Sequence, residues 1–193
     1  MEQNFWQRNK VLVIVLIVVV ILAFWVVGKY NFFINQNEAI TGQWAQVENQ
    51  LQRRFDLIPN VINTVKGITE QEKDVFSQLA EARTQYAGAT TTDQKAAAAG
   101  QVESSLGRLL VIVENYPELK SSQSFRDLTV ELEGTENRIA VERMKYNDLV
   151  KSLNASVKRF PNSILASIFS VAERSYFEVT DGAEVVPKVD FSQ

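Results

Sequence analysis

The polar side chains that could carry chemistry here are acids, amides and arginines, because the chain of 193 residues contains neither histidine nor cysteine. Without these two residue types, Cys- or His-based zinc sites, iron–sulfur sites, thiol nucleophiles and Ser–His–Asp catalysis are excluded. Carboxylates alone can hold Ca²⁺ or Mg²⁺ or act as an acid–base pair. Pairs such as Glu133 and Glu136 are common on helices, however, and the sequence has no dense acidic loop. We therefore predict no catalytic residue, no metal ion and no cofactor.

A second group of polar residues lies close to apolar helix faces and suits contacts between helices. Arg54 and Asp56 are too close in the sequence to pair across a helical turn, so each is expected to meet another helix. A buried polar network that fixes helix register is the favoured interpretation; a docking surface and a cation or acid–base site are the alternatives. The candidate residues are Arg53, Arg54, Asp56, Asn60, Glu114, Asn115, Tyr116, Glu136, Asn137, Arg143, Tyr146 and Asn147.

The composition is that of a folded protein that does not bind nucleic acid. Hydrophobic residues make up 46% and charged residues 22% of the chain, which is too apolar for disorder. The net charge is −3 and the two signs are interspersed, so a basic nucleic-acid footprint is missing from the sequence.

The elements that position these residues begin with an uninterrupted apolar segment, residues 11–27, which reads VLVIVLIVVVILAFWVV. As a helix it spans about 25 Å, close to the thickness of a bilayer core. The aromatic residues that suit the two membrane interfaces are Phe5, Trp6, Trp25, Tyr30, Phe32 and Phe33.

The alternative for this segment is a cleaved signal peptide with Arg8 and Lys10 as its basic region. The length of the apolar run and the lack of a small-x-small cleavage site near residues 28–35 favour a retained transmembrane anchor. By the positive-inside rule, Arg8 and Lys10 against Lys29 alone place the N-terminus in the cytoplasm and the domain outside it.

From residue 38 onward, apolar residues recur at steps of three or four, which indicates amphipathic helices and not strands. The predicted helices cover residues 38–66, 69–87, 93–116 and about 122–160. Their apolar faces consist of Trp44, Val47, Leu51, Phe55, Ile58, Ile62, Val65, Val75, Leu79, Ala82, Tyr86, Ala99, Val102, Leu106, Leu109, Val113, Tyr116, Phe125, Leu128, Leu132, Thr135, Ile139, Tyr146, Val150, Leu153, Val157 and Phe160.

Helix boundaries follow from capping and breaking residues. Pro59 should kink the first helix, and Gly67 should end it. Thr69 with Glu72 forms a capping box for the second helix, and Asp93 is the candidate N-cap of the third.

The last long helix is expected to begin at Ser122 or Ser124, after Pro117 has ended the third helix. It ends before Pro161 after about 36 residues. Its apolar face is interrupted at residues 142–143, which form either a register-setting polar layer or a stretch that faces solvent.

These features predict an all-α protein with an N-terminal transmembrane helix followed by an antiparallel bundle of about four long helices. Residues 1–10 are a flank, residues 11–30 the anchor, residues 31–163 the bundle, and residues 164–193 a short amphipathic helix with an irregular tail. The tail is expected to pack on the bundle; the alternative is an exposed apolar peptide that meets a partner subunit or lipid.

Several strings together resemble the signatures of the LemA family. They are RRFDLIPN at residues 53–60 with VKG at 65–67, ENYPELK at 114–120, ELEGTENRIA at 131–140 with YN at 146–147, FPN at 160–162 and PKVDF at 187–191. The chain departs from the family pattern where residues 160–163 run directly into Ile164 and at residues 170–173. The resemblance implies a bacterial protein anchored in the inner membrane, with a long helical domain and no agreed biochemical activity.

We predict a membrane-anchored, non-enzymatic helical scaffold that self-associates and organises partner proteins or membrane shape. The alternative is a single-pass sensor or adaptor whose domain binds a soluble partner, and an enzyme of unrecognised type is a third class. The expected partners are the lipid bilayer, further copies of the chain and an unidentified protein, with no nucleic acid and no small-molecule substrate. Burial of Arg54, Asp56 and Asn137 favours the scaffold, and their exposure favours the adaptor.

Overall fold

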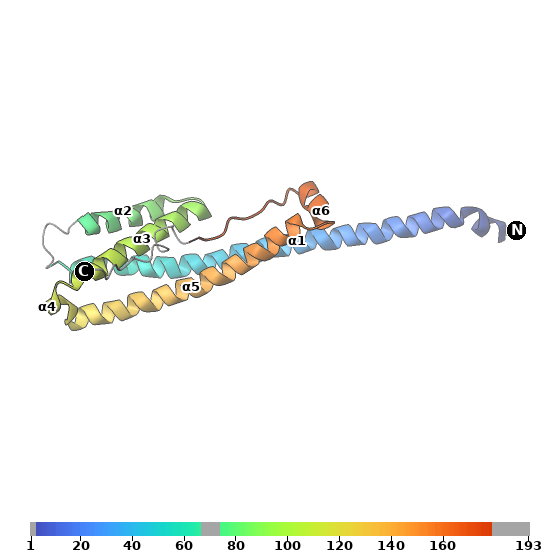
Figure 1. Cartoon of the computed structure of the whole chain (residues 1–193). Coiled ribbons are helices and arrows are strands. Elements are labelled where there is room, and N and C mark those ends of the chain that lie inside the picture. The colour runs from blue at the N-terminus through green and yellow to red at the C-terminus, as the bar shows by residue number, and fades with distance from the viewer. Residues whose placement is uncertain (1–2, 67–73, 179–193) are drawn as a thin grey trace, which may run out of the picture. The chain divides into compact units, whose positions relative to one another are not determined.

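The computed structural model describes residues 3–66 and 74–178, and every regular element within them is a helix (Figure 1). The helices are α1 (Gln3–Thr64), α2 (Asp74–Gly88), α3 (Thr92–Val113), α4 (Pro117–Lys120), α5 (Gln123–Lys158) and α6 (Asn162–Ile168). The predicted all-α class is confirmed. The chain divides into two compact units, residues 1–42 with 148–174 and residues 43–147 with 175–193.

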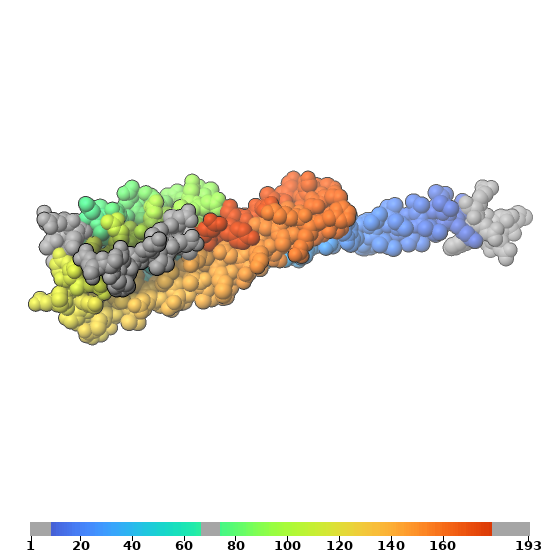
Figure 2. Space-filling model, viewed as in Figure 1, coloured from blue at the N-terminus to red at the C-terminus, as the bar shows by residue number. Residues whose placement is uncertain are grey.

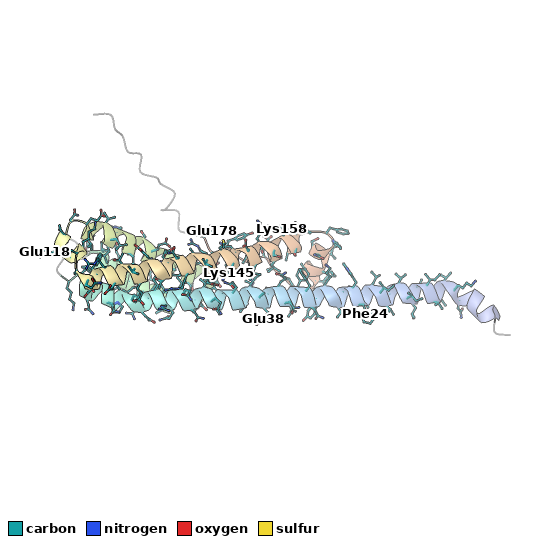
Figure 3. All side chains as sticks on the ribbon, turned by 90° about the horizontal axis from the view of Figure 1, so that it is seen from below. Phe24, Glu38, Glu118, Lys145, Lys158 and Glu178 are labelled. Carbon is teal, nitrogen blue, oxygen red and sulfur yellow. The ribbon has the colours of Figure 1, made fainter. Side chains whose placement is uncertain are left out.

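The first unit contains the apolar part of α1, which no other described residue covers. Residues 11–25 are exposed, and their large apolar side chains keep between 37% and 76% of their surface accessible. Phe24 points away from the helix in Figure 3, and the same stretch is blue in Figure 2. A soluble protein does not leave such a surface in water, so this helix fits the predicted membrane anchor. α3 is also long and apolar enough to span a bilayer, but nearly half of its apolar window is buried.

Beyond the apolar run, α1 packs against the end of α5 and against α6. Phe33 and Ile40 of α1 are buried, as are Val150 and Leu153 of α5. Their apolar faces therefore form the core of the first unit. The side chain of Asn154 on α5 binds the backbone of Arg174 twice, with both nitrogen–oxygen distances at 2.9 Å.

The second unit is built from the rest of α1 and α5 together with α2, α3 and α4. The apolar faces predicted for α2, α3 and the first part of α5 form its core, and α2 lies beside α3 (Figure 1). On α1 the prediction was wrong at Ile62, which is half-buried, because the buried steps run from Ile58 through Val61 to Val65. Contacts of Arg53 with Glu131 and of Gln43 with Glu142 show that α1 and α5 run antiparallel here.

The N-cap of α3 differs from the predicted one. Thr91, and not Asp93, is the N-cap. Its hydroxyl oxygen accepts from the Gln94 backbone amide, and the Gln94 side-chain oxygen accepts from the Thr91 backbone amide. Asp93 lies inside the first turn, because this reciprocal capping box fixes the start of the helix two residues earlier.

α3 ends at Val113, three residues before the predicted end. Tyr116 has a non-helical backbone, as expected before Pro117, which becomes the first residue of the short helix α4. α4 was not predicted from the sequence. The predicted start of α5 is confirmed, because the Ser122 hydroxyl accepts from the Phe125 amide at 3.2 Å.

The C-terminal part differs from the prediction at Phe160, which is 81% exposed and does not extend the apolar face of α5, since α5 ends at Lys158. The short helix expected after α5 is α6, which ends at Ile168, and residues 171–178 are irregular. Phe177 is buried, so this part of the tail packs on the helices. The predictions for Gly67, Thr69, Glu72 and residues 187–191 lie outside the described residues.

Candidate functional site

The candidate site is a polar network inside the second unit, and Arg54 is its buried member. Arg54 of α1 is only 8% exposed, and its Nη1 donates to the Glu136 carboxylate of α5. A buried guanidinium requires a counter-charge, because an unpaired charge in the interior costs several kcal/mol, on the order of 3–5. Arg54 of the first signature thus pairs with Glu136 of the third.

A second carboxylate, that of Glu103, joins this network from α3. Burial raises the pKa of Glu103 above its ordinary value of 4.5, and the negative charge of Glu136 raises it further. The guanidinium groups of Arg54 and Arg143 act in the opposite direction. Two acids and two arginines thus meet from three helices.

Arg143 completes the network on the side of the C-terminal segment. Its guanidinium lies 5.7 Å from the centre of the Phe177 ring, a cation–π distance. Arg54, Glu103, Arg143 and Phe177 also line a small hollow with space for about one water molecule. Ligand pockets have volumes of roughly 300–1,000 Å³, so this hollow does not suit a substrate.

The interruption at residues 142–143 is a polar layer between helices. Gln43 of α1 donates to the Glu142 carboxylate at 2.6 Å and to its backbone carbonyl at 3.1 Å. Hydrogen bonds from Lys145 and Gln43 lower the pKa of Glu142. This layer specifies the pairing of α1 with α5, because a shifted register would leave the amide and the carboxylate unpaired.

Asn147 and Tyr146 hold the C-terminal segment on α5. The Asn147 side chain accepts from the Phe177 amide at 2.8 Å and donates to the Phe177 carbonyl at 3.0 Å. The Tyr146 hydroxyl donates to the Ser175 carbonyl at 3.1 Å. The Trp44 ring packs edge-on against both Tyr146 and Phe177. These two candidate residues therefore bind the chain's own backbone.

The remaining candidate polar residues of the first and third signatures are exposed. Arg53 is exposed and lies 3.9 Å from Glu131, which is a weak surface pair. Asp56 accepts a hydrogen bond from Gln52 one turn earlier on α1, and not from another helix as expected. Asn60 and Asn137 are exposed. Exposure therefore does not decide between scaffold and adaptor, since Arg54 is buried while Asp56 and Asn137 are exposed.

The second signature covers the turn after α3 and the whole of α4, and it begins about three helical turns along from Glu103. Glu114 pairs with Lys120 at 3.4 Å, and both side chains are exposed. The Asn115 amide donates to the Ile112 carbonyl, and the half-buried Tyr116 precedes α4. These three residues build a helix corner and do not belong to the Arg54 network.

Three network members were not predicted: Gln43, Glu103 and Phe177. A sequence signal for Glu103 exists in the small residues Ala99 and Gly100 one turn earlier, which leave space beside it. No comparable signal identifies Phe177, because its position depends on how the tail returns to α5.

Comparison with known proteins matches the LemA family model to residues 43–191. Magnetosome protein MamQ 2 of Paramagnetospirillum magneticum is 26% identical over 176 residues, covering 78% of this chain and 65% of the relative. MamQ of Magnetospirillum gryphiswaldense is 25% identical over 175 residues, covering 77% and 64%. Protein LemA of Metamycoplasma hominis is 19% identical over 156 residues, covering 80% and 71%. The chain thus spans less than two thirds of the magnetosome relatives' length. Because the model covers most of the chain, including the Arg54 network, this protein belongs to the LemA family.

Proposed function

We propose that this protein is a membrane-anchored, non-enzymatic scaffold whose copies self-associate and organise partner proteins or membrane shape. The observation that carries the proposal is the exposed apolar stretch of residues 11–25, which continues within one helix into the packed domain. The relatives named for the magnetosome are named for a cellular structure and not for a reaction, which supports a structural role. The membrane in question is the bacterial inner membrane, with the domain outside the cytoplasm.

The outer face of α5 offers a surface for a second copy. Val130, Val141 and Met144 are exposed by 44–68%, and with Gly134 and Asn137 they step by four, three, four and three residues. This heptad stripe lies opposite the face that packs in the core. The Arg138 guanidinium borders it, 3.6 Å from where a Cβ on Gly134 would lie.

The charges beside this stripe favour a parallel pair of α5 helices. In a parallel coiled coil, a residue at one flank meets the residue five positions later on the partner helix. That rule brings Glu133 to Arg138 of a second copy, and Arg126 to Glu131. A two-fold axis along the membrane normal, which relates copies of one topology, permits this parallel arrangement.

The test is disulfide trapping in native membranes, which the absence of cysteine makes unambiguous. Asn137→Cys places one thiol in the stripe, and Gln85→Cys places one on the exposed face of α2 as a control. We expect a crosslinked dimer from the first variant only. Glu133→Arg should reduce trapping through repulsion from Arg138, and adding Arg138→Glu should restore it. Monomer alone from every variant would reject self-association through α5.

A sensor or adaptor is the second candidate, because Arg53, Asp56 and Asn60 form an exposed polar row on α1. Their spacing of three and four residues places them on one face, which suits a soluble partner protein. A photo-crosslinking amino acid at Asn60 in living cells should then give one discrete heterologous product. If only the free chain is recovered while the α5 disulfide forms, the adaptor role is rejected.

A further inference from the structure

α6 presents an apolar surface outside the anchor and within the same unit. Ile164 and Ile168 are one turn apart on α6 and are 54% and 67% exposed, and Phe160 just before the helix is 81% exposed. The opposite side of α6 is buried through Leu165 and Ala166. We call Phe160, Ile164 and Ile168 the α6 tip. The sequence of α6, NSILASI, contains no charged residue.

The α6 tip lies at the level where α1 leaves its apolar run. The Phe169 ring, next to Ile168, packs edge-on against Tyr30 with ring centres 5.1 Å apart. Tyr30 follows the last residue of the apolar run by three positions, about 4.5 Å along the helix. Arg174 meets Asn37, seven residues further from the run, so the chain moves away from the apolar stretch after α6. Figure 1 shows α6 beside α1 within this unit.

From this placement we infer that the α6 tip inserts into the interface of the bilayer that α1 spans, as a second and shallower membrane contact. The inference rests on the proposed anchor. Tyr30 and Trp25 are interfacial residue types, so the neighbouring tip is at headgroup depth. One side of α6 is packed against the protein, and the exposed apolar side chains of the tip lie on the other side. At headgroup depth, the apolar environment closest to these side chains is lipid.

The charges around the tip suit a phospholipid surface. Arg159 is exposed directly beside Phe160, and Lys158 is bound to Glu173 at 2.7 Å with most of its side chain accessible. Lys29 lies 5.5 Å from the Phe32 ring on α1. Long basic side chains can reach lipid phosphates while their apolar neighbours enter the acyl boundary. Two contacts from one unit restrict its tilt and rotation at the membrane, which a single helix does not.

Site-directed labelling of the full chain tests this inference, because each introduced cysteine is the only one in the protein. Phe160→Cys, Ile164→Cys and Ile168→Cys each receive an environment-sensitive fluorophore. Val18→Cys reports on the anchor, and Glu38→Cys is the exposed control on α1. The proteins are reconstituted in vesicles of phosphatidylethanolamine and phosphatidylglycerol, and helix content is checked by circular dichroism.

We expect the tip labels to be quenched several-fold less by aqueous iodide than the Glu38 label, and to be quenched by lipids brominated near the headgroup. If the tip labels behave like the Glu38 label while the Val18 label is shielded, the second contact is rejected and the anchor stands. If the Val18 label is also open to iodide, the anchor itself is rejected. Shielding from iodide without quenching by brominated lipid would mean that protein covers the tip, which also rejects lipid insertion.

Discussion

Arg54 is a charged residue buried in the second unit, and its pairing with Glu136 explains why the protein tolerates it there. Its partner Glu136 keeps about a third of its side chain exposed, so the pair lies at the edge of the core. Removing one member leaves the charge of the other poorly compensated. The exposed pair of Arg53 and Glu131 contributes little to stability, so its loss should cost little.

We therefore predict that Arg54→Ala lowers the free energy of unfolding by about 2–3 kcal/mol, slightly below the range for fully buried pairs. The matched variant Arg53→Ala should change it by roughly 0–1 kcal/mol. Urea unfolding of the full chain in detergent, followed by circular dichroism, measures both. Equal effects at the two positions would contradict the assignment of Arg54 as the buried member.

The shifted pKa of Glu103 predicts how the stability of the protein depends on pH. Its pKa is raised by burial and by Glu136, so the folded state favours its protonated form. The stability that comes from this form is complete below about pH 4.5 and is lost as the pH rises through the folded-state pKa.

Glu103→Gln, which resembles the protonated acid, should thus stabilise the protein at neutral pH, and the gain should vanish below pH 4.5. Glu114→Gln in the exposed α3–α4 turn is the control and should show no such trend. The measurement is the urea midpoint between pH 4 and 8 for the three proteins. A Glu103→Gln variant that is less stable than the parent at neutral pH would show that the arginines dominate at this position.

At the scale of elements, the helix ends are set by local hydrogen bonds that need no tertiary contact. The reciprocal bonds between Thr91 and Gln94 occur within four residues, and the Ser122 bond to Phe125 is equally local. Such caps stabilise a helix by about 1 kcal/mol.

Thr91→Ala is therefore expected to lower the free energy of unfolding by about 1 kcal/mol. Thr92→Ala removes a neighbouring hydroxyl from the first helical position, where alanine is well tolerated, and should have little effect. Thermal unfolding by circular dichroism compares the two. The same loss from both variants would argue against the capping box at Thr91.

For the whole molecule, the proposed membrane attachment and the proposed self-association should be linked through the local concentration of the chains. In the proposed dimer the α5 stripe covers about two heptads and includes Gly134 and Asn137, so we expect association in dilute solution to be weak. Confinement to a membrane raises the effective concentration of the chains and favours the dimer.

Leu16→Arg puts a charge in the middle of the apolar run, at a cost of about 2.5–3.5 kcal/mol for insertion. We expect it to move protein from the membrane fraction to the soluble fraction and to reduce α5 disulfide trapping in parallel. Ala39→Arg, on the exposed surface beyond the run, should do neither. Fractionation followed by immunoblotting measures both the membrane fraction and the disulfide trapping. Undiminished trapping of a soluble Leu16→Arg protein would show that association does not depend on anchoring.

Short-range patterns were enough to predict the helical class, the long apolar helix near the N-terminus, the apolar faces of α2 and α3, and the start of α5. All of these depend on periodicity or capping, whose physical causes lie within a few residues. Glu136 was one of several candidate polar residues on the last long helix, and the sequence did not single it out as the partner of Arg54.

Which polar residues face inward depends instead on how the helices pack. Arg53, Arg54 and Asp56 are close neighbours in the sequence, yet only Arg54 is buried, because its position on α1 points toward α3 and α5. Glu103 and Phe177 belong to the network for the same reason, because burial and charge partners arise where distant segments meet. The small residues before Glu103 indicate space beside it but not which charges fill that space, and no sequence pattern indicates the position of Phe177.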